Sequence, residues 1–150
     1  MAPKRKAEAT RWFQQAAYDL KAARWNVQGG FHDTACFLSQ QAGEKALKSL
    51  LYYVGGRRVA LLTHSLVEMI THAGKQVGSL TELLDDAREL DLHYIPSRYP
   101  NGLPSGYPHA FYGQATSEKA VEAAQRIVDA VAHHYRSAGE HGIVEPPEGG

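Results

Sequence analysis

The 150-residue sequence is poor in the features that mark secreted, membrane and disulfide-bonded proteins. Its single cysteine, Cys36, has no partner for an internal disulfide, so we expect a reducing compartment. No apolar run approaches the length that a bilayer requires, and the basic start MAPKRKAEAT lacks the apolar stretch of a secretory signal. The sequence therefore predicts a cytoplasmic protein without a membrane segment.

An excess of charge of either sign is also lacking. The 16 Lys and Arg residues balance the 16 Asp and Glu residues. Tight non-specific binding to nucleic acid relies on neutralising phosphates, and a chain without net charge does not provide that field. Any contact with RNA must then come from a local patch.

Several catalytic and metal-binding patterns are absent. The eight histidines are scattered, and none has the spacing of a strong metal site, so we expect no metal and no cofactor. No glycine-rich loop followed by Lys and Ser or Thr is present to hold phosphates. Cys36 lies in an apolar helical pattern, which favours a buried thiol over a nucleophile.

Helical periodicity dominates what is present, and no segment alternates apolar and polar residues as a half-buried strand does. Apolar residues recur at helical spacing over residues 7–27, 33–54 and 117–135. Ser-x-x-Glu patterns at Ser65 and Ser79 predict the starts of two further helices. Because short connections favour antiparallel neighbours, we predict an all-α, up-and-down antiparallel bundle of four to five helices.

The length predicts one domain, a bundle over residues 7–136. We expect residues 1–6 to form a basic N-terminal extension. Residues 137–150 contain too few apolar side chains to pack firmly, which predicts a flexible C-terminal tail. Before the last helix, residues 94–113 contain four prolines and three glycines and predict a long irregular loop.

A polar face of the helix over residues 33–54 is the first candidate site. Gln41, Glu44, Lys45 and Lys48 share this face, since residues three, four and seven apart are neighbours on a helix. One interpretation is a solvated surface with an ordinary Glu44–Lys48 pair. The other is a ridge that meets a ligand or a partner.

The long loop carries the second candidate site, centred on Arg98. Aromatic faces stack on bases and a guanidinium binds phosphate through paired hydrogen bonds, so the loop suits a nucleotide or single-stranded RNA. Alternatively, its rings pin the loop to the bundle. His64, just before the third helix, either is structural or reaches a neighbouring helix. The aromatic residues of the loop are Tyr94, Tyr99, Tyr107, Phe111 and Tyr112.

Four stretches, in this order, resemble the HEPN family, named for nucleotide binding in higher eukaryotes and prokaryotes: WFQQAAYDLKAA, FLSQQAGEKALKSLL, THSLVEMI and YIPSRYP. With the last helical pattern they cover roughly residues 7–136. The chain is most similar to the branch related to the HEPN domain of the eukaryotic chaperone sacsin. Prokaryotic members of that branch are often encoded beside a minimal nucleotidyltransferase.

This resemblance implies a helical bundle that frequently pairs into a homodimer. It also implies a nucleotide-binding or partner-binding role in a two-component, toxin-antitoxin-like system with a nucleotidyltransferase. Transfer of a nucleotidyl group to Tyr94 or Tyr99 by the partner is a further hypothesis. The candidate nucleotide- or RNA-binding residues are Arg98, Tyr94, Tyr99, His64, Lys45 and Lys48.

Metal-independent endoribonuclease activity is the alternative function, because many members of the family cleave RNA. Their signature is an Arg and a His separated by four to six residues, and Arg88 and His93 have that spacing. Candidate catalytic residues are therefore Arg88 and His93, and for this branch the resemblance implies Arg98 as the arginine instead. However, Glu89 would repel phosphate, and five positions on a regular helix turn two side chains apart by about 140°.

Overall fold

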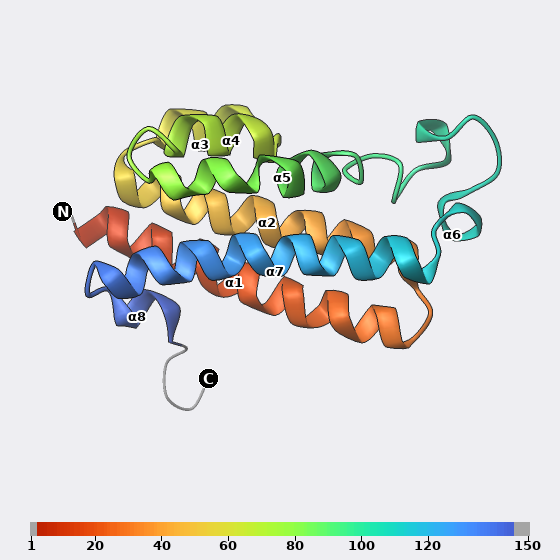
Figure 1. Ribbon diagram of the computed structural model, residues 1–150, viewed down its shortest axis with the longest axis horizontal. Coiled ribbons are helices and arrows are strands. Elements are labelled where there is room, and N and C mark those ends of the chain that lie inside the picture. The colour runs from red at the N-terminus through yellow and green to blue at the C-terminus, as the bar shows by residue number, and fades with distance from the viewer. Residues whose placement is uncertain (1–2, 146–150) are drawn as a thin grey trace.

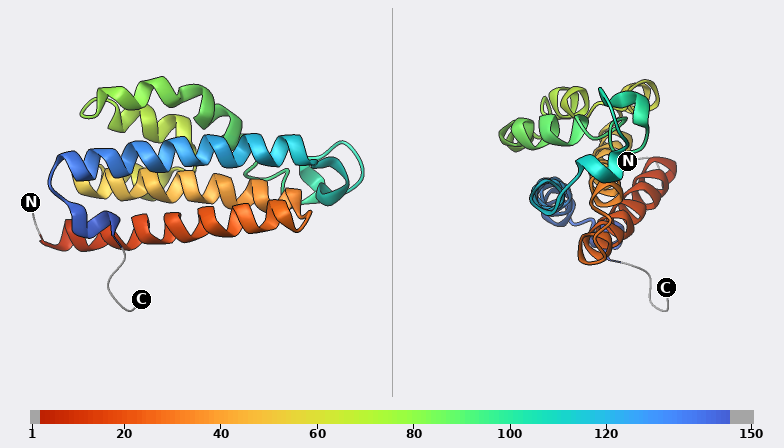
Figure 2. Two further views of the ribbon diagram at one scale, coloured as in Figure 1. Left: turned by 60° about the horizontal axis from the view of Figure 1, so that its bottom comes forward. Right: turned by 90° about the vertical axis from the view of Figure 1, so that its right-hand side faces the viewer.

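The computed structural model describes residues 3–145. They form an all-helical bundle without a strand, which confirms the predicted fold class. Three long helices lie side by side: α1 (Pro3–Gln28), α2 (His32–Val54) and α7 (Gln114–Ser137) (Figure 1). The short helices between residues 57 and 91 form a second layer beside α2 and α7, as Figure 2 shows. The other α-helices are α3 (Arg57–Leu62), α4 (Leu66–Ala73), α5 (Leu84–Asp91), α6 (Pro108–Phe111) and α8 (His141–Val144).

Glycines end the first two helices, α1 and α2. Gly30 has φ 81° in the tight turn between α1 and α2, and Gly55 has φ 94° at the end of α2. Side chains disfavour this left-handed conformation, so glycine is the residue that allows the chain to leave the helix there. The α1–α2 hairpin therefore forms within a few residues of the predicted bounds.

Helix α2 is the centre of the core, because α1, α7 and α4 all pack on it. Leu47 and Leu50 of α2 are fully buried together with Leu66 of α4 and Ile127 of α7. Helix α2 is thus covered on several sides. No helix within residues 3–145 is both long and apolar enough to cross a membrane.

One chain of buried hydrogen bonds joins the three long helices. The Ser49 hydroxyl on α2 donates to the carbonyl oxygen of Ala9 on α1 at 2.6 Å. The hydroxyl oxygens of Ser49 and Tyr135, on α7, lie 2.7 Å apart. Because an unpaired buried hydroxyl is costly, these bonds fix the register of the helices at this end of the bundle.

Two terminal predictions need correction. Residues 3–6 of the expected basic extension belong to α1, and the predicted flexible tail is wrong for residues 137–145. Helix α8 packs against α1, and its Ile143 is fully buried. The physical reason is that Gly139, at φ 79°, turns the chain back so that a single isoleucine reaches the core. The remaining tail residues, 146–150, lie outside the described part.

The short helices also differ from expectation. Ser65 caps α4 as predicted, since its hydroxyl accepts from the backbone N–H of Glu68 at 3.2 Å. The cap predicted at Ser79 is wrong, because a 3₁₀ segment, Gly78–Leu83, precedes α5 and no side chain caps it. Helices α3 and α6 were not predicted, and both are too short to show an amphipathic period.

Replacing Gly43 tests the packing around α2. Alanine in place of a mid-helix glycine ordinarily stabilises a helix by roughly 0.5–1 kcal/mol. At position 43, however, a Cβ would lie 2.7 Å from Leu66 Cδ2 and 3.0 Å from Leu90 Cδ1, both fully buried. We expect Gly43→Ala to lower the free energy of unfolding by about 1–3 kcal/mol in urea titrations. The control is Gly142→Ala, whose Cβ would meet nothing within 4 Å; equal stability of the two variants would contradict the packing.

Candidate functional site

Asp91 holds the start of α4 against the end of α5. Its carboxylate accepts hydrogen bonds from the backbone N–H of Leu66 at 2.7 Å and of Val67 at 3.2 Å. These are unpaired donors of the first turn of α4, and a carboxylate there also interacts favourably with the helix dipole. His64 precedes this cap and Tyr94 follows Asp91 by three residues, so the cap brings the two rings together.

His64 and Tyr94 stack, with ring centroids 5.0 Å apart and an interplanar angle of 19°. The Tyr94 carbonyl oxygen accepts from Arg98 Nε at 2.9 Å. The Arg98 guanidinium carbon lies 4.4 Å from the ring centroid of Phe37, 4.8 Å from that of Tyr94 and 5.0 Å from that of Tyr99. We call these four residues, Phe37, Tyr94, Arg98 and Tyr99, the Arg98 cage.

The guanidinium of Arg98 is held by aromatic rings and a carbonyl oxygen. Among the residues that the structure describes, no carboxylate forms an ion pair with Arg98, and its Nη groups have no hydrogen-bond acceptor. Each cation–π contact contributes roughly 0.5–2 kcal/mol, depending on exposure. The side chain is half-buried and fixed through Nε, so its two Nη groups are the part left for a ligand.

Glu44 of α2 is connected to the cage through His64, which bonds to Glu44 and stacks on Tyr94. Glu44 is only 4% exposed, and its Oε1 accepts from His64 Nδ1 and Gln40 Nε2, both at 3.2 Å. Its Oε2 lies 3.3 Å from Lys48 Nζ. A buried carboxylate needs such partners because desolvation is costly. His64 is therefore held between Glu44 and Tyr94.

The two candidate lysines do not join the cage. Lys48 is buried by the chain itself, pairs with Glu44, and its ammonium lies 5.4 Å from the Trp12 ring centroid. Lys45 pairs with Asp19 of α1 at 2.5 Å. The predicted Glu44–Lys48 pair thus exists, but it lies in the interior and not on a solvated surface. Lys45 faces a separate groove.

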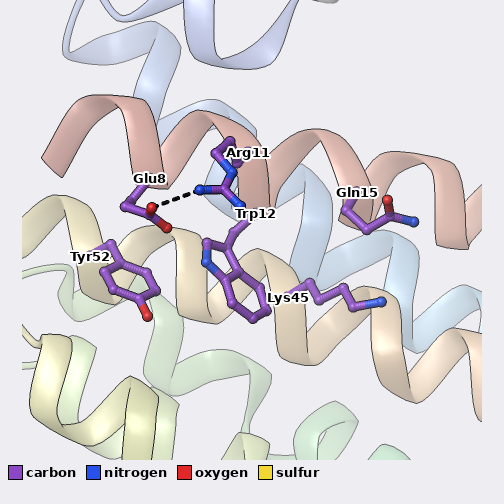
Figure 3. A pocket seen from close by; sticks show the side chains of 6 residues that line it. All are labelled: Glu8, Arg11, Trp12, Gln15, Lys45 and Tyr52. Atoms are coloured by element: carbon purple, nitrogen blue, oxygen red, sulfur yellow. Dashed lines mark hydrogen bonds and ion pairs between the residues drawn. The ribbon is translucent and has the colours of Figure 1, made fainter. Parts of the chain in front are cut away.

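That groove lies between α1 and α2 and has a volume of about 470 Å³ (Figure 3). Its apolar part is a stack of Trp12 on Tyr52, with centroids 6.0 Å apart and planes 23° apart. The sequence did not predict this groove, because Trp12 belongs to the apolar stripe of the first helix and such a pattern predicts a core residue. We call it the Trp12 groove; its lining is Glu8, Arg11, Trp12, Gln15, Lys45 and Tyr52.

The ribonuclease candidates differ in exposure and have different partners. Arg88 lies on the surface, where it pairs with Asp85 at 2.8 Å. His93 is buried, with Nδ1 3.1 Å from the Tyr112 hydroxyl oxygen and Nε2 3.4 Å from Glu89 Oε1. Because a carboxylate only accepts, the neutral ring carries its proton on Nε2, and Nδ1 accepts from Tyr112. Arg98 has neither side chain among its partners.

Burial shifts the pKa of two side chains in this region, His93 and Cys36. It lowers the pKa of His93 below its usual value, although the Glu89 hydrogen bond and charge act in the opposite direction. Burial, aided by Glu89 and Asp33, raises the pKa of the Cys36 thiol to about 12. At neutral pH the thiol is therefore protonated and a poor nucleophile. Within residues 3–145, no three His, Cys, Asp or Glu side chains are grouped to hold a metal ion.

Comparison with known proteins gives both a family and related structures. The model of the HEPN domain family matches residues 9–134. A Thermus thermophilus protein, TT1696, is 33% identical with a TM-score of 0.76, over 84% of this chain and 97% of that one. An archaeal HEPN homologue, ST0689, is 34% identical with a TM-score of 0.71, over 85% and 97%. A HEPN domain protein of Thermotoga maritima, tm0613, is 28% identical with a TM-score of 0.60, over 84% and 98%. No curated protein matches.

The lowered pKa of His93 predicts a pH-dependent stability. As the pH falls through about 6.5, the unfolded chain takes up a proton at His93 that the folded chain does not. The free energy of unfolding must therefore decrease as the pH falls through this range. We expect the decrease between about pH 7.5 and about pH 5.5 to be smaller in His93→Gln than in the parent protein, measured by urea unfolding. An equal decrease in both proteins would contradict a buried neutral imidazole.

Proposed function

The chain belongs to the HEPN domain family, whose model matches residues 9–134, and from this premise we propose that it is the nucleotide-binding component of a two-component system. Its ligand is a nucleotide whose phosphate binds Arg98. Its partner is a minimal nucleotidyltransferase, and both act in the cytoplasm. The observation that carries the proposal is the Arg98 cage, a fixed guanidinium without a carboxylate partner among the described residues.

Preorganisation makes the cage suited to phosphate. Ordering a long side chain on binding costs free energy, and Arg98 is already ordered by the Tyr94 carbonyl oxygen and three rings. Its Nη groups can then donate two parallel hydrogen bonds to one phosphate, which an ammonium cannot match. Tyr99 is 50% exposed beside the guanidinium, so its ring is available to stack on the base.

A protein partner is part of the proposal. The similarity to the sacsin-related branch supports the nucleotidyltransferase, and the homodimer is proposed on the same ground. Leu61, Leu62 and Leu92 are 61%, 75% and 67% exposed, and apolar side chains of this size are suited to an interface. The exposed Tyr99, or its neighbour Tyr94, is the proposed acceptor if the partner transfers a nucleotidyl group.

Ribonuclease activity is the weaker candidate. The spacing of Arg88 and His93 favours it, whereas their geometry does not. A phosphate-binding Arg and a proton-transferring His must reach the same phosphodiester. Here Arg88 is on the surface with Asp85, and His93 is buried against Tyr112 and Glu89.

Substitution of Arg98 tests nucleotide binding. We expect Arg98→Ala to weaken binding of AMP or GMP by about tenfold or more, because a charge-assisted pair of hydrogen bonds is lost. Arg98→Lys keeps the charge but loses the paired geometry, so it should recover only part of the affinity. Isothermal titration calorimetry of the parent and both variants measures this.

Arg88→Ala is the matched control for that titration, since Arg88 is an exposed arginine already paired with Asp85. We expect its affinity for AMP and GMP to equal that of the parent protein. Absence of saturable binding to the parent, or equal losses in the Arg88 and Arg98 variants, would reject the cage as the nucleotide site.

The proposal also predicts that the chain alone leaves RNA intact. Expression of the parent protein should arrest growth no more than Arg88→Ala or His93→Ala does, and incubation with total RNA should give no new fragments. Cleavage by the parent that both substitutions abolish, with the variants still folded by circular dichroism, would establish the ribonuclease alternative instead.

A further inference from the structure

Helix α3 packs on α2 and α4 at the end of the bundle where α1 begins (Figure 1). It contributes Ala60, which is buried, to the core, and Val59 beside it is half-buried. Leu61 and Leu62, by contrast, are 61% and 75% exposed. The side chains that α3 exposes are two arginines and two leucines: Arg57, Arg58, Leu61 and Leu62.

These four side chains form two rows along the helix. Residues four apart lie on the same face, so Leu61 follows Arg57 in one row and Leu62 follows Arg58 in the other. Each row therefore has a cation at its start and an apolar side chain at its end. Large apolar side chains that are exposed next to each other are typical of a surface that binds something else.

Two hollows beside α3 contribute further cations. Lys4 and Arg5, in the first turn of α1, line a hollow of about 410 Å³ together with Arg57. A Cβ at Gly55 would lie 3.3 Å from Arg5 Nη1, so this guanidinium packs on the turn that precedes α3. Lys75 lines a second hollow, of about 330 Å³, whose wall includes part of α3. The fold thus brings cations from α1 and from the turn after α4 to α3.

The positive charge of this surface is not compensated. Of the two carboxylates that line the hollows, Glu8 pairs with Arg11 at 2.9 Å. The other, Glu68, accepts a hydrogen bond from the Thr63 hydroxyl. The five cations form no ion pair within residues 3–145, although the net charge of the chain is zero. With Leu61 and Leu62 we call them the α3 face; the cations are Lys4, Arg5, Arg57, Arg58 and Lys75.

We propose that the α3 face docks on a bilayer surface that contains anionic lipids. Its leucines enter the boundary between headgroups and acyl chains, and its cations bind the headgroup phosphates. Arginine suits this boundary because its long stem lies along apolar surface while its charge stays in water. Docking of this kind requires no spanning helix.

Both components of the face select this occupant. A nucleic acid backbone complements the five cations but offers no apolar layer to the leucines. A second copy of this chain, in a symmetric contact, would bring the same positive charges against one another. A bilayer with anionic lipids complements the cations and the leucines together, and the cytoplasmic leaflet contains such lipids.

This inference goes beyond the proposed function, because the α3 face shares no residue with the Arg98 cage. Lipid covers Leu61 and Leu62, which leaves the exposed Leu92 for the proposed protein partner. The two proposals can therefore fail separately.

Sedimentation with vesicles tests the docking. We expect the parent protein to bind vesicles of phosphatidylcholine and phosphatidylglycerol in equal parts, saturably and less tightly as salt is added. It should not bind vesicles of phosphatidylcholine alone. The double variant Arg57→Gln/Arg58→Gln should bind the mixed vesicles more weakly by about tenfold or more, because each cation near an anionic surface adds to the affinity. Arg98→Ala should bind them as the parent does, which separates this surface from nucleotide binding.

The matched control for charge is Lys21→Gln/Arg24→Gln, which removes the same charge from two exposed positions in the second half of α1. Neither residue lines a hollow beside α3. We expect this variant to bind the mixed vesicles as the parent does. No binding of the parent to the mixed vesicles, or equal losses in the two double variants, would overturn the proposal.

Leu62→Ser tests the apolar part of the face. We expect it to weaken binding to the mixed vesicles by about fivefold or more, because a leucine no longer enters the bilayer. Leu92→Ser, at a leucine that is 67% exposed after α5, should bind as the parent does. Circular dichroism of each variant verifies that it is folded. If the arginine variant loses binding and Leu62→Ser keeps it, the face binds anions in general, and the bilayer assignment is wrong.

Discussion

The carboxylate of Glu44 is buried on the helix around which the bundle packs, and the candidate site is built from the contacts that neutralise it. Lys48 supplies the opposite charge and His64 supplies a hydrogen bond from the layer of short helices. His64 in turn stacks on Tyr94, and the Tyr94 carbonyl oxygen holds Arg98. Glu44, His64 and Tyr94 thus connect a core helix to the guanidinium of Arg98 on a proline-rich loop. That loop is ordered by contacts with the core and not by its own composition.

Charge pairing is uneven along the chain, although its net charge is zero. In the middle of the α1–α2 face the lysines have carboxylate partners, as Lys45 has Asp19 and Lys48 has Glu44. Arg98, by contrast, has three aromatic rings and a carbonyl oxygen as its partners and no carboxylate among the described residues. A local imbalance of charge, which the net charge of the chain does not reveal, is therefore what would attract a phosphate-bearing ligand to Arg98.

Much of the fold could be predicted from the sequence, and less of the site. Gly30 and Gly55 set the ends of α1 and α2, so the predicted bounds of the long helices are close to those observed. Arg98 stands out because aromatic residues surround it in the sequence. Phe37 was not expected in the cage, since helical period places a residue on a face but does not say which loop will cover that face. For the same reason Lys48 was predicted at a ligand surface but is buried, and Ile143 was expected in a tail but packs in the core.

The most direct test of the central claim is a crystal structure of the protein with AMP bound. We expect the single phosphate within hydrogen-bond distance of both Arg98 Nη atoms and the adenine ring against Tyr99. A phosphate bound elsewhere while the guanidinium keeps its place, or Arg98 turned away to pair with a carboxylate of its own chain, would contradict it.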